Sequence, residues 1–306
     1  MFDGIGDVRN RHAYVPADIV AAAQDFEPDA VLVSGWQDAG YVKVCKVLKA
    51  SGVPIVAGCD TQWTGSLRQR IAGIVAPLYL HKFIDVLWVT GERQRQLANK
   101  LGYYGDCCWD GYYSCDFDCF SKDGSRVDTG EPPFGFLYVG RYVPEKGLDT
   151  LAAAYKSYCR QVSDPWPLVC AGSGGLRELL VESGADDRGF VQPHELPALL
   201  AECACFILPS RFEPWGVVAH EAAAAGLALI LSDKCGSGVH LLRPNLNGFE
   251  FHAGSAKELA EKMLLMHRLS QSEILDMKKA SYNLSSQYTP RRWASILIDG
   301  LPKRDK

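Results

Sequence analysis

Two glutamates, Glu213 and Glu221, lie eight positions apart in the stretch EPWGVVAHE. A carboxylate accepts paired hydrogen bonds from adjacent hydroxyl groups, so two carboxylates can hold the sugar and the ribose of one ligand. If the segment between them is helical, a rise of about 1.5 Å per residue separates them by roughly 12 Å, close to the span of a nucleotide diphosphate sugar. The alternative is that Glu213 only stabilises the helix dipole and Glu221 lies on the helix surface.

The residues around this pair predict a helix that begins near Pro214 and ends at Gly226. Proline suits the first turn of a helix, and glycine commonly follows the last turn. The backbone N–H groups of Trp215, Gly216 and Val217 then lie at the positive end of the helix, where they can bind a diphosphate.

Two cations follow a strand-like run in GRYVPEKG, where Gly140 ends the run and Arg141 and Lys146 come next. A guanidinium and an ammonium group at the end of a strand can neutralise a diphosphate. The alternative is a solvated turn with two surface cations.

Two further segments also follow or form strand-like runs. In AGSGG, Gly172 and Gly174 allow the backbone to approach a phosphate or a ribose. Arg177 stands where the dinucleotide-binding motif needs its last glycine, so that motif is excluded. In GFVQPHELPALL we expect a short strand and then a helix, with the backbone around Val191 facing a nucleobase.

These motifs must be positioned by alternating strands and helices. Short apolar runs alternate with helical segments from Phe134 onward, and the same pattern occurs in shorter form earlier in the chain. We expect strands at DAVLVSG, VPIVAG, DVLWVT, FGFLYVG, PLVCAG, CACFILP and LALILSD. The fold class is therefore α/β, with two Rossmann-like domains whose parallel sheets bind a ligand at the carboxyl ends of their strands.

A polar, turn-rich stretch at residues 121–133 predicts the linker between the two domains. We expect a first domain at 1–125, a second at 126–286 and a helix at 287–306 that packs back on the first domain.

The composition limits the class of protein. The chain has 306 residues, a net charge of −4 and a pI near 6.0, which argues against nonspecific nucleic-acid binding. The longest apolar run, IAGIVAPLYL, is about half the length of a membrane span, and no signal peptide is recognisable. We therefore expect a cytoplasmic protein with reduced cysteines.

No metal or other cofactor is expected. The DFD triplet at 116–118 imitates a metal-binding D-x-D motif, but it precedes the linker instead of following a nucleotide-domain strand. Cys115 and Cys119 lie four positions apart with no histidine nearby, so a zinc site is not expected there either.

In this order and spacing, GRYVPEKG, AGSGG, GFVQPHELPALL, PSRFEPWGVVAHEAAAAG and LRPNLNGFEF resemble the family 4 glycosyltransferases. These are retaining enzymes of the GT-B fold, in which two domains face a central cleft, and the E-x7-E pair is their signature. The resemblance implies that Arg141 and Lys146 hold the donor diphosphate and stabilise the leaving group. It further implies that Glu213 contacts the donor sugar and that Glu221 clamps the ribose.

The resemblance implies metal-independent transfer of a hexose from a UDP- or GDP-linked sugar to a glycan or lipid-linked glycan acceptor, in cell-surface polysaccharide biosynthesis. Two cations and a helix N-terminus can stabilise the departing diphosphate. Two alternatives stay open: a noncatalytic nucleotide-sugar-binding subunit, and an NDP-sugar epimerase on the same fold.

The chain departs from the family pattern in its first domain. Compared with that pattern, we expect the opening βα units of that domain to be missing before Pro28. Asp60 stands where relatives often have a histidine, and with Trp63 it is a candidate for the acceptor side, through a hydrogen bond and ring stacking on a sugar. The alternative is a turn aspartate and a core tryptophan.

The segment SLRQRIAGIVAPLYLHKF, residues 66–83, predicts a helix packed into the core. Because Arg68, Arg70 and Lys82 accompany its apolar residues, the alternative is peripheral contact with the anionic inner face of a membrane.

Overall fold

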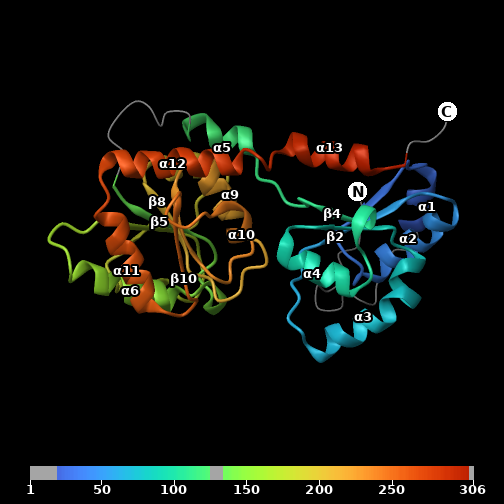
Figure 1. Ribbon diagram of the computed structural model, residues 1–306, viewed down its shortest axis with the longest axis horizontal. Coiled ribbons are helices and arrows are strands. Elements are labelled where there is room, and N and C mark those ends of the chain that lie inside the picture. Colours follow the sequence, from blue (N-terminus) through green and yellow to red (C-terminus); the bar gives the residue numbers. More distant parts are fainter. Residues whose placement is uncertain (1–18, 125–133, 303–306) are drawn as a thin grey trace. The chain divides into compact units, whose positions relative to one another are not determined.

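The computed structural model describes residues 19–124 and 134–302 (Figure 1). The described residues form two compact units: the first extends to Tyr112 and resumes at Trp293, and the second comprises the residues between. Each unit has its own parallel sheet with helices packed against it. The predicted α/β class is therefore confirmed.

The first unit contains a four-stranded sheet with the strands in chain order. They are β1 (Val31–Val33), β2 (Ile55–Cys59), β3 (Val86–Val89) and β4 (Cys108–Asp110). The connecting helices are α2 (Ala39–Ala50), α3 (Leu67–Tyr79) with η2 (Leu80–Lys82), and α4 (Glu92–Lys100) with η3 (Gly105–Cys107), while α1 (Ile19–Asp25) contacts α2. Every residue of β2 is buried, as expected for a strand of a parallel sheet that is covered on both faces.

Alternation along β3 explains how both faces of this sheet are filled. Leu87 and Val89 belong to one core cluster, whereas Trp88 between them points to the opposite face. There it stacks on Trp293 of α13 (Pro290–Gly300), with ring centroids 4.7 Å apart. The indole N–H of Trp293 donates to the carbonyl of Tyr112 at 2.9 Å. The helix expected within 287–306 thus covers the second face of the first sheet.

Helix α3 is not a core helix, so that prediction was wrong. Ala76 is its only buried residue, and Ile74 and Leu78 are 78% and 72% exposed. The reason is a close approach at Gly73, where a Cβ atom would lie 2.8 Å from the carbonyl oxygen of Lys100. The helix therefore approaches the end of α4 through Gly73, and the side chains of Ile74 and Leu78 are left exposed. No helix in the described stretches is long and apolar enough to cross a membrane.

The second unit contains a six-stranded parallel sheet in the order β10-β9-β8-β5-β6-β7. Its strands are β5 (Phe136–Val139), β6 (Leu168–Ala171), β7 (Asp186–Asp187), β8 (Cys205–Leu208), β9 (Ala228–Ser232) and β10 (Gly248–Phe251). Helices α6 (Leu148–Cys159) and α11 (Ala256–His267) pack together on one face, and α9 (Val217–Ala224) and α12 (Gln271–Ser285) pack on the other (Figure 1). The shorter helices are η5 (Pro144–Lys146), α7 (Arg177–Val181), α8 (Leu196–Ala201) and α10 (Gly238–Leu241).

The division between the units differs from the boundary expected at 125/126. Helix α5 (Phe117–Gly124) packs against α8 and α9, and Phe117 and Phe120 are buried in the core of the second unit. Two apolar rings in a polar, turn-rich stretch thus tie this segment to the unit that follows it. Residues 121–124 of the predicted linker complete α5, and the remainder lies outside the described residues.

The short strand expected at the start of GFVQPHELPALL does not form, and β7 lies just before it. This edge strand has only two residues, both aspartates, so no apolar run marks it in the sequence.

Candidate functional site

The loops that follow β5 and β6 are packed backbone against backbone. A Cβ atom at Gly172 would collide with the carbonyl oxygen of Gly140, and one at Gly174 would lie 2.5 Å from that of Tyr142. The φ angles of Gly172 and Gly174 are 155° and 145°, which side chains rarely adopt. The N–H of Tyr142 donates to the carbonyl of Ser173 at 2.7 Å. Glycine is therefore required at both positions for the contact between the two loops.

Asp187 connects these two loops through its carboxylate. This residue was not identified from the sequence. Its carboxylate accepts hydrogen bonds from the Tyr142 hydroxyl at 2.8 Å, from Arg177 at 2.5 Å and from the Gly189 N–H at 3.1 Å. Burial acts to raise the pKa of Asp187, but the hydrogen bonds outweigh it and the pKa lies below its ordinary value. The Gly189 carbonyl in turn accepts a hydrogen bond from the β6 loop, which brings the backbone near Val191 alongside that loop. Arg177, which replaces the last glycine of the dinucleotide motif, thus pairs with Asp187.

Lys146 and Glu213 contact each other. Gly147 has a φ of 68°, and a Cβ atom there would collide with the carbonyl oxygen of Pro209, so η5 lies directly against the end of β8. The ammonium group of Lys146 pairs with the buried carboxylate of Glu213, and the Ser210 hydroxyl donates to the same carboxylate at 3.1 Å. Two predicted catalytic residues, 67 positions apart in the chain, therefore form one ion pair.

Arg211 fastens the Glu213 loop to η5 and α6. Its N–H donates to the carbonyl of Glu145 at 2.8 Å, and its guanidinium donates to the carbonyl of Pro144 at 3.1 Å. The guanidinium also pairs with Asp149 at 2.5 Å, which lowers the pKa of that carboxyl group. Sequence reasoning missed this residue, because an arginine in a polar loop carries no pattern that names its partners.

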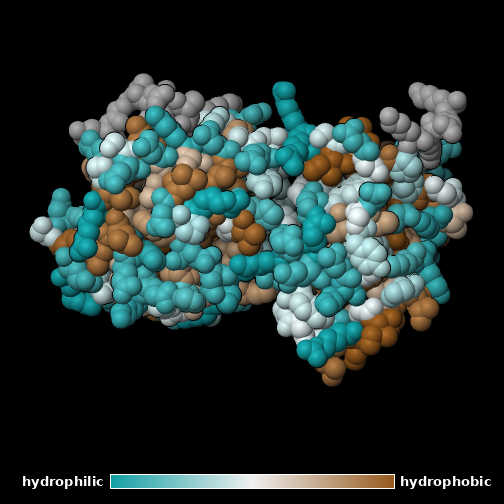
Figure 2. Space-filling view, in the orientation of Figure 1, coloured by the Kyte–Doolittle hydropathy of each residue, from teal (hydrophilic) through white to brown (hydrophobic). Residues whose placement is uncertain are grey.

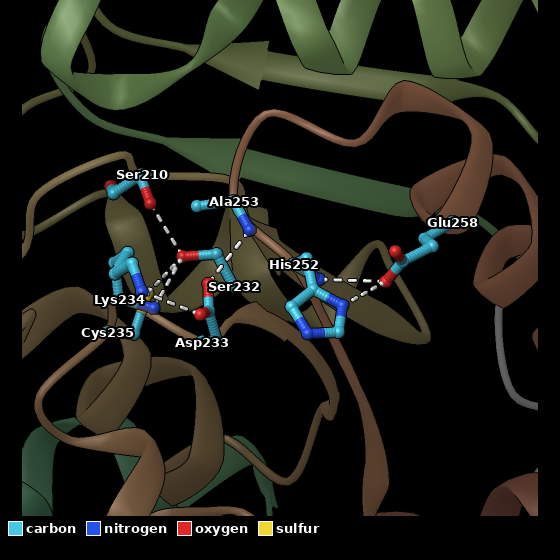
Figure 3. A network of polar contacts seen from close by, with 8 residues as sticks. All are labelled: Ser210, Ser232, Asp233, Lys234, Cys235, His252, Ala253 and Glu258. Carbon is cyan, nitrogen blue, oxygen red and sulfur yellow. Dashed lines mark hydrogen bonds and ion pairs between the residues drawn. The ribbon is translucent and has the colours of Figure 1, made fainter.

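The end of β9 and the residues that follow it contact the loop after β8, which leads to Glu213, and the segment after β10 (Figure 3). The Ser232 hydroxyl donates to the carbonyl of Ser210 at 2.6 Å, and the Asp233 carboxylate accepts a hydrogen bond from the Ala253 N–H at 2.8 Å. Further along, the N–H of Gly236 donates to the carbonyl of Glu213 at 3.0 Å. The backbone of Glu213 is thereby fixed by segments that follow β8, β9 and β10.

Helix α9 begins at Val217, so the predicted start at Pro214 was wrong. Gly216 precedes the helix with a φ of 91°, a left-handed conformation that the helix cannot include, and no side chain caps this N-terminus. Glu213 consequently lies in the preceding loop, and the distance of about 12 Å along one helix does not describe the pair with Glu221.

The predicted end of the helix at Gly226 is confirmed. Gly226 has a φ of 76°, and its N–H donates to the carbonyl of Ala223 at 3.0 Å. The N–H of Leu227 donates to the carbonyl of Ala222 at 2.9 Å, which completes a Schellman motif.

Trp215 is turned into the unit. Its ring is buried and tilted against His240, with centroids 5.3 Å apart, and its indole N–H has no hydrogen-bond partner among the residues described. Its carbonyl accepts a hydrogen bond from the Ser237 N–H at 2.9 Å. The buried ring positions the start of α9, so a ligand would meet the backbone at Trp215.

Two neighbouring side chains on α9 have strongly shifted pKa values. Burial raises the pKa of Glu221 to about 7, and its carboxyl group makes no hydrogen bond within the described parts of the chain. Burial lowers the pKa of His220 to about 4, so its ring is neutral near pH 7. The neutral ring accepts a hydrogen bond from the Cys115 N–H at 3.2 Å and donates to the carbonyl of Ser285 at 3.3 Å. His220 is thus a structural clamp, whereas Glu221 is a carboxyl group that lacks a partner.

Arg141 follows β5 and is exposed. Its carbonyl accepts a hydrogen bond from the Tyr138 hydroxyl at 2.9 Å, which fixes the backbone. Its guanidinium makes no hydrogen bond or ion pair with the residues described here, so it is available for an anionic ligand.

The acceptor-side candidates belong to the first unit. Asp60 is exposed after β2 and lines a cavity of about 270 Å³ formed at the ends of β1 and β2. Trp63 packs against the core cluster of this unit and does not line that cavity. Asp116 of the DFD triplet accepts a hydrogen bond from the Cys119 N–H at 3.2 Å and so caps the start of α5.

The two α/β units, each built on a sheet of parallel strands, define the class of fold. The crystal structure of Anabaena HepE in complex with UDP is 17% identical, with a TM-score of 0.74 over 92% of this chain and 81% of that one. The structure of the pneumococcal O-GlcNAc transferase GtfA in complex with UDP and GlcNAc is 16% identical, with a TM-score of 0.69 over 94% of this chain and 60% of that one. At these identities the likeness concerns the fold, and it confirms the predicted GT-B class.

The family follows from the sequence comparison. Residues 125–283 match the family described as "Glycosyl transferases group 1", and the chain belongs to this family. Glycogen synthase of Mycobacterium tuberculosis is 37% identical over 121 residues, which cover 37% of this chain. GDP-mannose:cellobiosyl-diphosphopolyprenol alpha-mannosyltransferase of Xanthomonas campestris is 33% identical over 130 residues, 39% of this chain. The matched regions span 28% and 32% of those two proteins. The predicted family is thereby confirmed.

Proposed function

We propose that the protein is a retaining, metal-independent glycosyltransferase that moves a hexose from a UDP- or GDP-linked sugar to a glycan or lipid-linked glycan acceptor in cell-surface polysaccharide biosynthesis. The observation that carries this proposal is the ion pair between Lys146 and Glu213, held by three loops at the carboxyl edge of the second sheet. In open parallel sheets, ligands bind at this edge.

The chemistry requires stabilisation of a departing anion. Breaking the bond between the anomeric carbon and the phosphate develops negative charge on the diphosphate. Lys146 and the exposed Arg141 supply two positive charges, and the uncapped N-terminus of α9 at Gly216 supplies backbone N–H groups. These groups stabilise the leaving group without a metal ion, and the acceptor attacks from the same face, which retains the configuration.

The carboxylates recognise the two sugars of the donor. In the free protein Lys146 neutralises Glu213, and donor binding exchanges this pair for two contacts: Lys146 with the diphosphate and Glu213 with sugar hydroxyls. Glu221, which has no partner in the structure as described, gains hydrogen bonds from the ribose hydroxyls. The backbone near Val191 faces the nucleobase.

The test is sugar transfer by two variants, Glu213→Gln and Lys146→Ala. Removing a group that stabilises the transition state costs about a hundredfold or more in turnover. The matched control is Lys156→Ala, which removes an exposed lysine from α6. Each variant is assayed by mass spectrometry with a panel of UDP- and GDP-sugars and acceptors, and circular dichroism verifies its fold.

Three results would contradict the proposal. Transfer by both site variants at the parent rate would exclude their catalytic role. Thermal stabilisation by nucleotide sugars without any product across the panel would indicate a noncatalytic binding subunit. Conversion of the donor sugar with no acceptor present would indicate an epimerase.

A further inference from the structure

Helix α3 presents a continuous apolar surface to solvent. Large apolar side chains that are at least two-fifths exposed occur throughout the helix: Leu67, Ile71, Ile74, Val75, Leu78 and Tyr79. In Figure 2 they form a brown area over α3 that differs from the mostly teal surface around it. An exposed apolar patch of this extent is characteristic of a surface that contacts a partner or a membrane.

The charged side chains in the segment that contains α3 all have one sign. The chain has no aspartate or glutamate between Asp60 and Asp85, whereas Arg68, Arg70 and Lys82 are exposed in that interval. A helix with exposed apolar residues and basic residues beside them, and no acidic ones, is complementary to an anionic lipid surface.

The groove beside the helix adds apolar surface. A cavity of about 850 Å³ is lined on one side by Ile71, Val75 and Tyr79 of α3 and on the other by Trp36 and Leu97. The apolar part of this lining extends the exposed surface of α3, and Arg68 lies beside it.

We propose that α3 docks the first unit onto an anionic phospholipid membrane, with the helix lying in the plane of the interface. Its 13 residues extend only about 20 Å, too short to cross the hydrocarbon core of about 30 Å. Ile74 and Leu78 enter the acyl boundary, and Arg68 and Lys82 meet the phosphate groups. This inference goes beyond the proposed sugar transfer and does not rest on it.

The experiment is sedimentation of the full chain with vesicles of equal parts phosphatidylcholine and phosphatidylglycerol, compared with vesicles of phosphatidylcholine alone. Binding to the anionic vesicles is expected. Ile74→Asp should weaken it about tenfold or more, because a charge replaces an inserted apolar side chain. The matched control is Ile298→Asp, at a residue of α13 that is 70% exposed, and it should bind as the parent does.

The positive charges are tested separately with Arg68→Gln and Lys82→Gln. Each should weaken binding about fivefold, since each basic residue near an anionic membrane contributes about 1 kcal/mol. Both side chains are exposed, so Arg68→Gln and Lys82→Gln should fold like the parent. They therefore still test the inference if Ile74→Asp fails to fold. Circular dichroism checks the fold of all four variants.

Several results would overturn the inference. Equal binding to the neutral vesicles would exclude the anionic surface as the partner. Unchanged binding of Ile74→Asp would place the contact elsewhere. Absence of binding would refute membrane docking, and a dimer in solution that Ile74→Asp dissociates would assign the surface to a second copy of the chain.

Discussion

Replacing Glu221 by glutamine should stabilise the protein at alkaline pH. Burial raises the pKa of this carboxyl group from an ordinary value near 4.5 to about 7. The stability that the protonated form contributes is therefore fully present below about pH 4.5 and is lost as pH rises through 7. Above that pH the folded protein holds an ionised carboxylate without a partner.

The magnitude follows from the pKa. Each pKa unit corresponds to about 1.4 kcal/mol, so ionised Glu221 lowers the free energy of unfolding by at most about 3 kcal/mol at pH 8. Glutamine has a similar shape and stays neutral at every pH. For a unit of this size about 1 kcal/mol shifts the melting temperature by 2–4 °C, so the variant should melt roughly 5 to 10 °C higher at pH 8 and close to the parent at pH 4.5.

The assay is urea and thermal unfolding of parent and variant at both pH values, followed by circular dichroism. Glu261→Gln is the control, because it neutralises an exposed glutamate in the middle of α11 and should leave the pH dependence unchanged. Equal shifts of Glu221→Gln relative to the parent at pH 4.5 and pH 8 would refute the argument that an unpaired, partly buried carboxylate destabilises the unit.

Two other substitutions test the framework of the site. Gly172→Ala should destabilise the protein by about 3 kcal/mol or more in urea unfolding, because its Cβ collides with Gly140 at a φ of 155°. Gly175→Ala, with open space around it, should change little, and equal losses in the two variants would contradict the steric argument. Since the pKa of His220 is lowered to about 4, the stability contributed by its neutral ring should be lost as pH falls from 6.5 through 4. His220→Gln should show a shallower loss of melting temperature over that range, and a loss as steep as the parent's would exclude His220 as the group that titrates.

The strands were predictable because burial on both faces leaves a direct trace in the sequence. CACFILP is apolar throughout and LALILSD is apolar up to Leu231, and their central residues form β8 and β9. The two-residue edge strand β7 has no such trace, because it consists of two aspartates, of which Asp187 bonds to Tyr142 and Arg177. Residue composition therefore predicts the centre of a parallel sheet better than its edge.

Helix α3 shows the opposite limit. An apolar stretch predicts burial only if something covers it, and the packing of Gly73 against α4 leaves the larger side chains uncovered. The amino-acid composition shows that α3 has an apolar surface. Only the tertiary contacts determine whether that surface faces the core or the solvent.

The site was predictable in its residues but not in their contacts. The types and order of Lys146 and Glu213 indicated an anion site, and the parallel sheet placed both at one edge. That they pair with each other depends on β5 and β8 being neighbours, and strand order is not written in local sequence. The start of α9 was misplaced because the left-handed conformation of Gly216 outweighed the preference of Pro214 for a first turn.

The order of strands in the second sheet also determines when the site can form during synthesis. β5 pairs with β6 early in the chain, but the ion pair requires β8 to insert on the other side of β5, and the Glu213 backbone is held only after β9 has joined. Such nonlocal parallel pairing is slow, because the chain loses the entropy of closing a long loop before the strand contacts contribute free energy. A nascent chain that has emerged only as far as α8 therefore contains the glycine loops and Lys146 but lacks the carboxylate. The Lys146–Glu213 pair with its full backbone support therefore forms only after β9 has left the ribosome, late in the synthesis of the second unit.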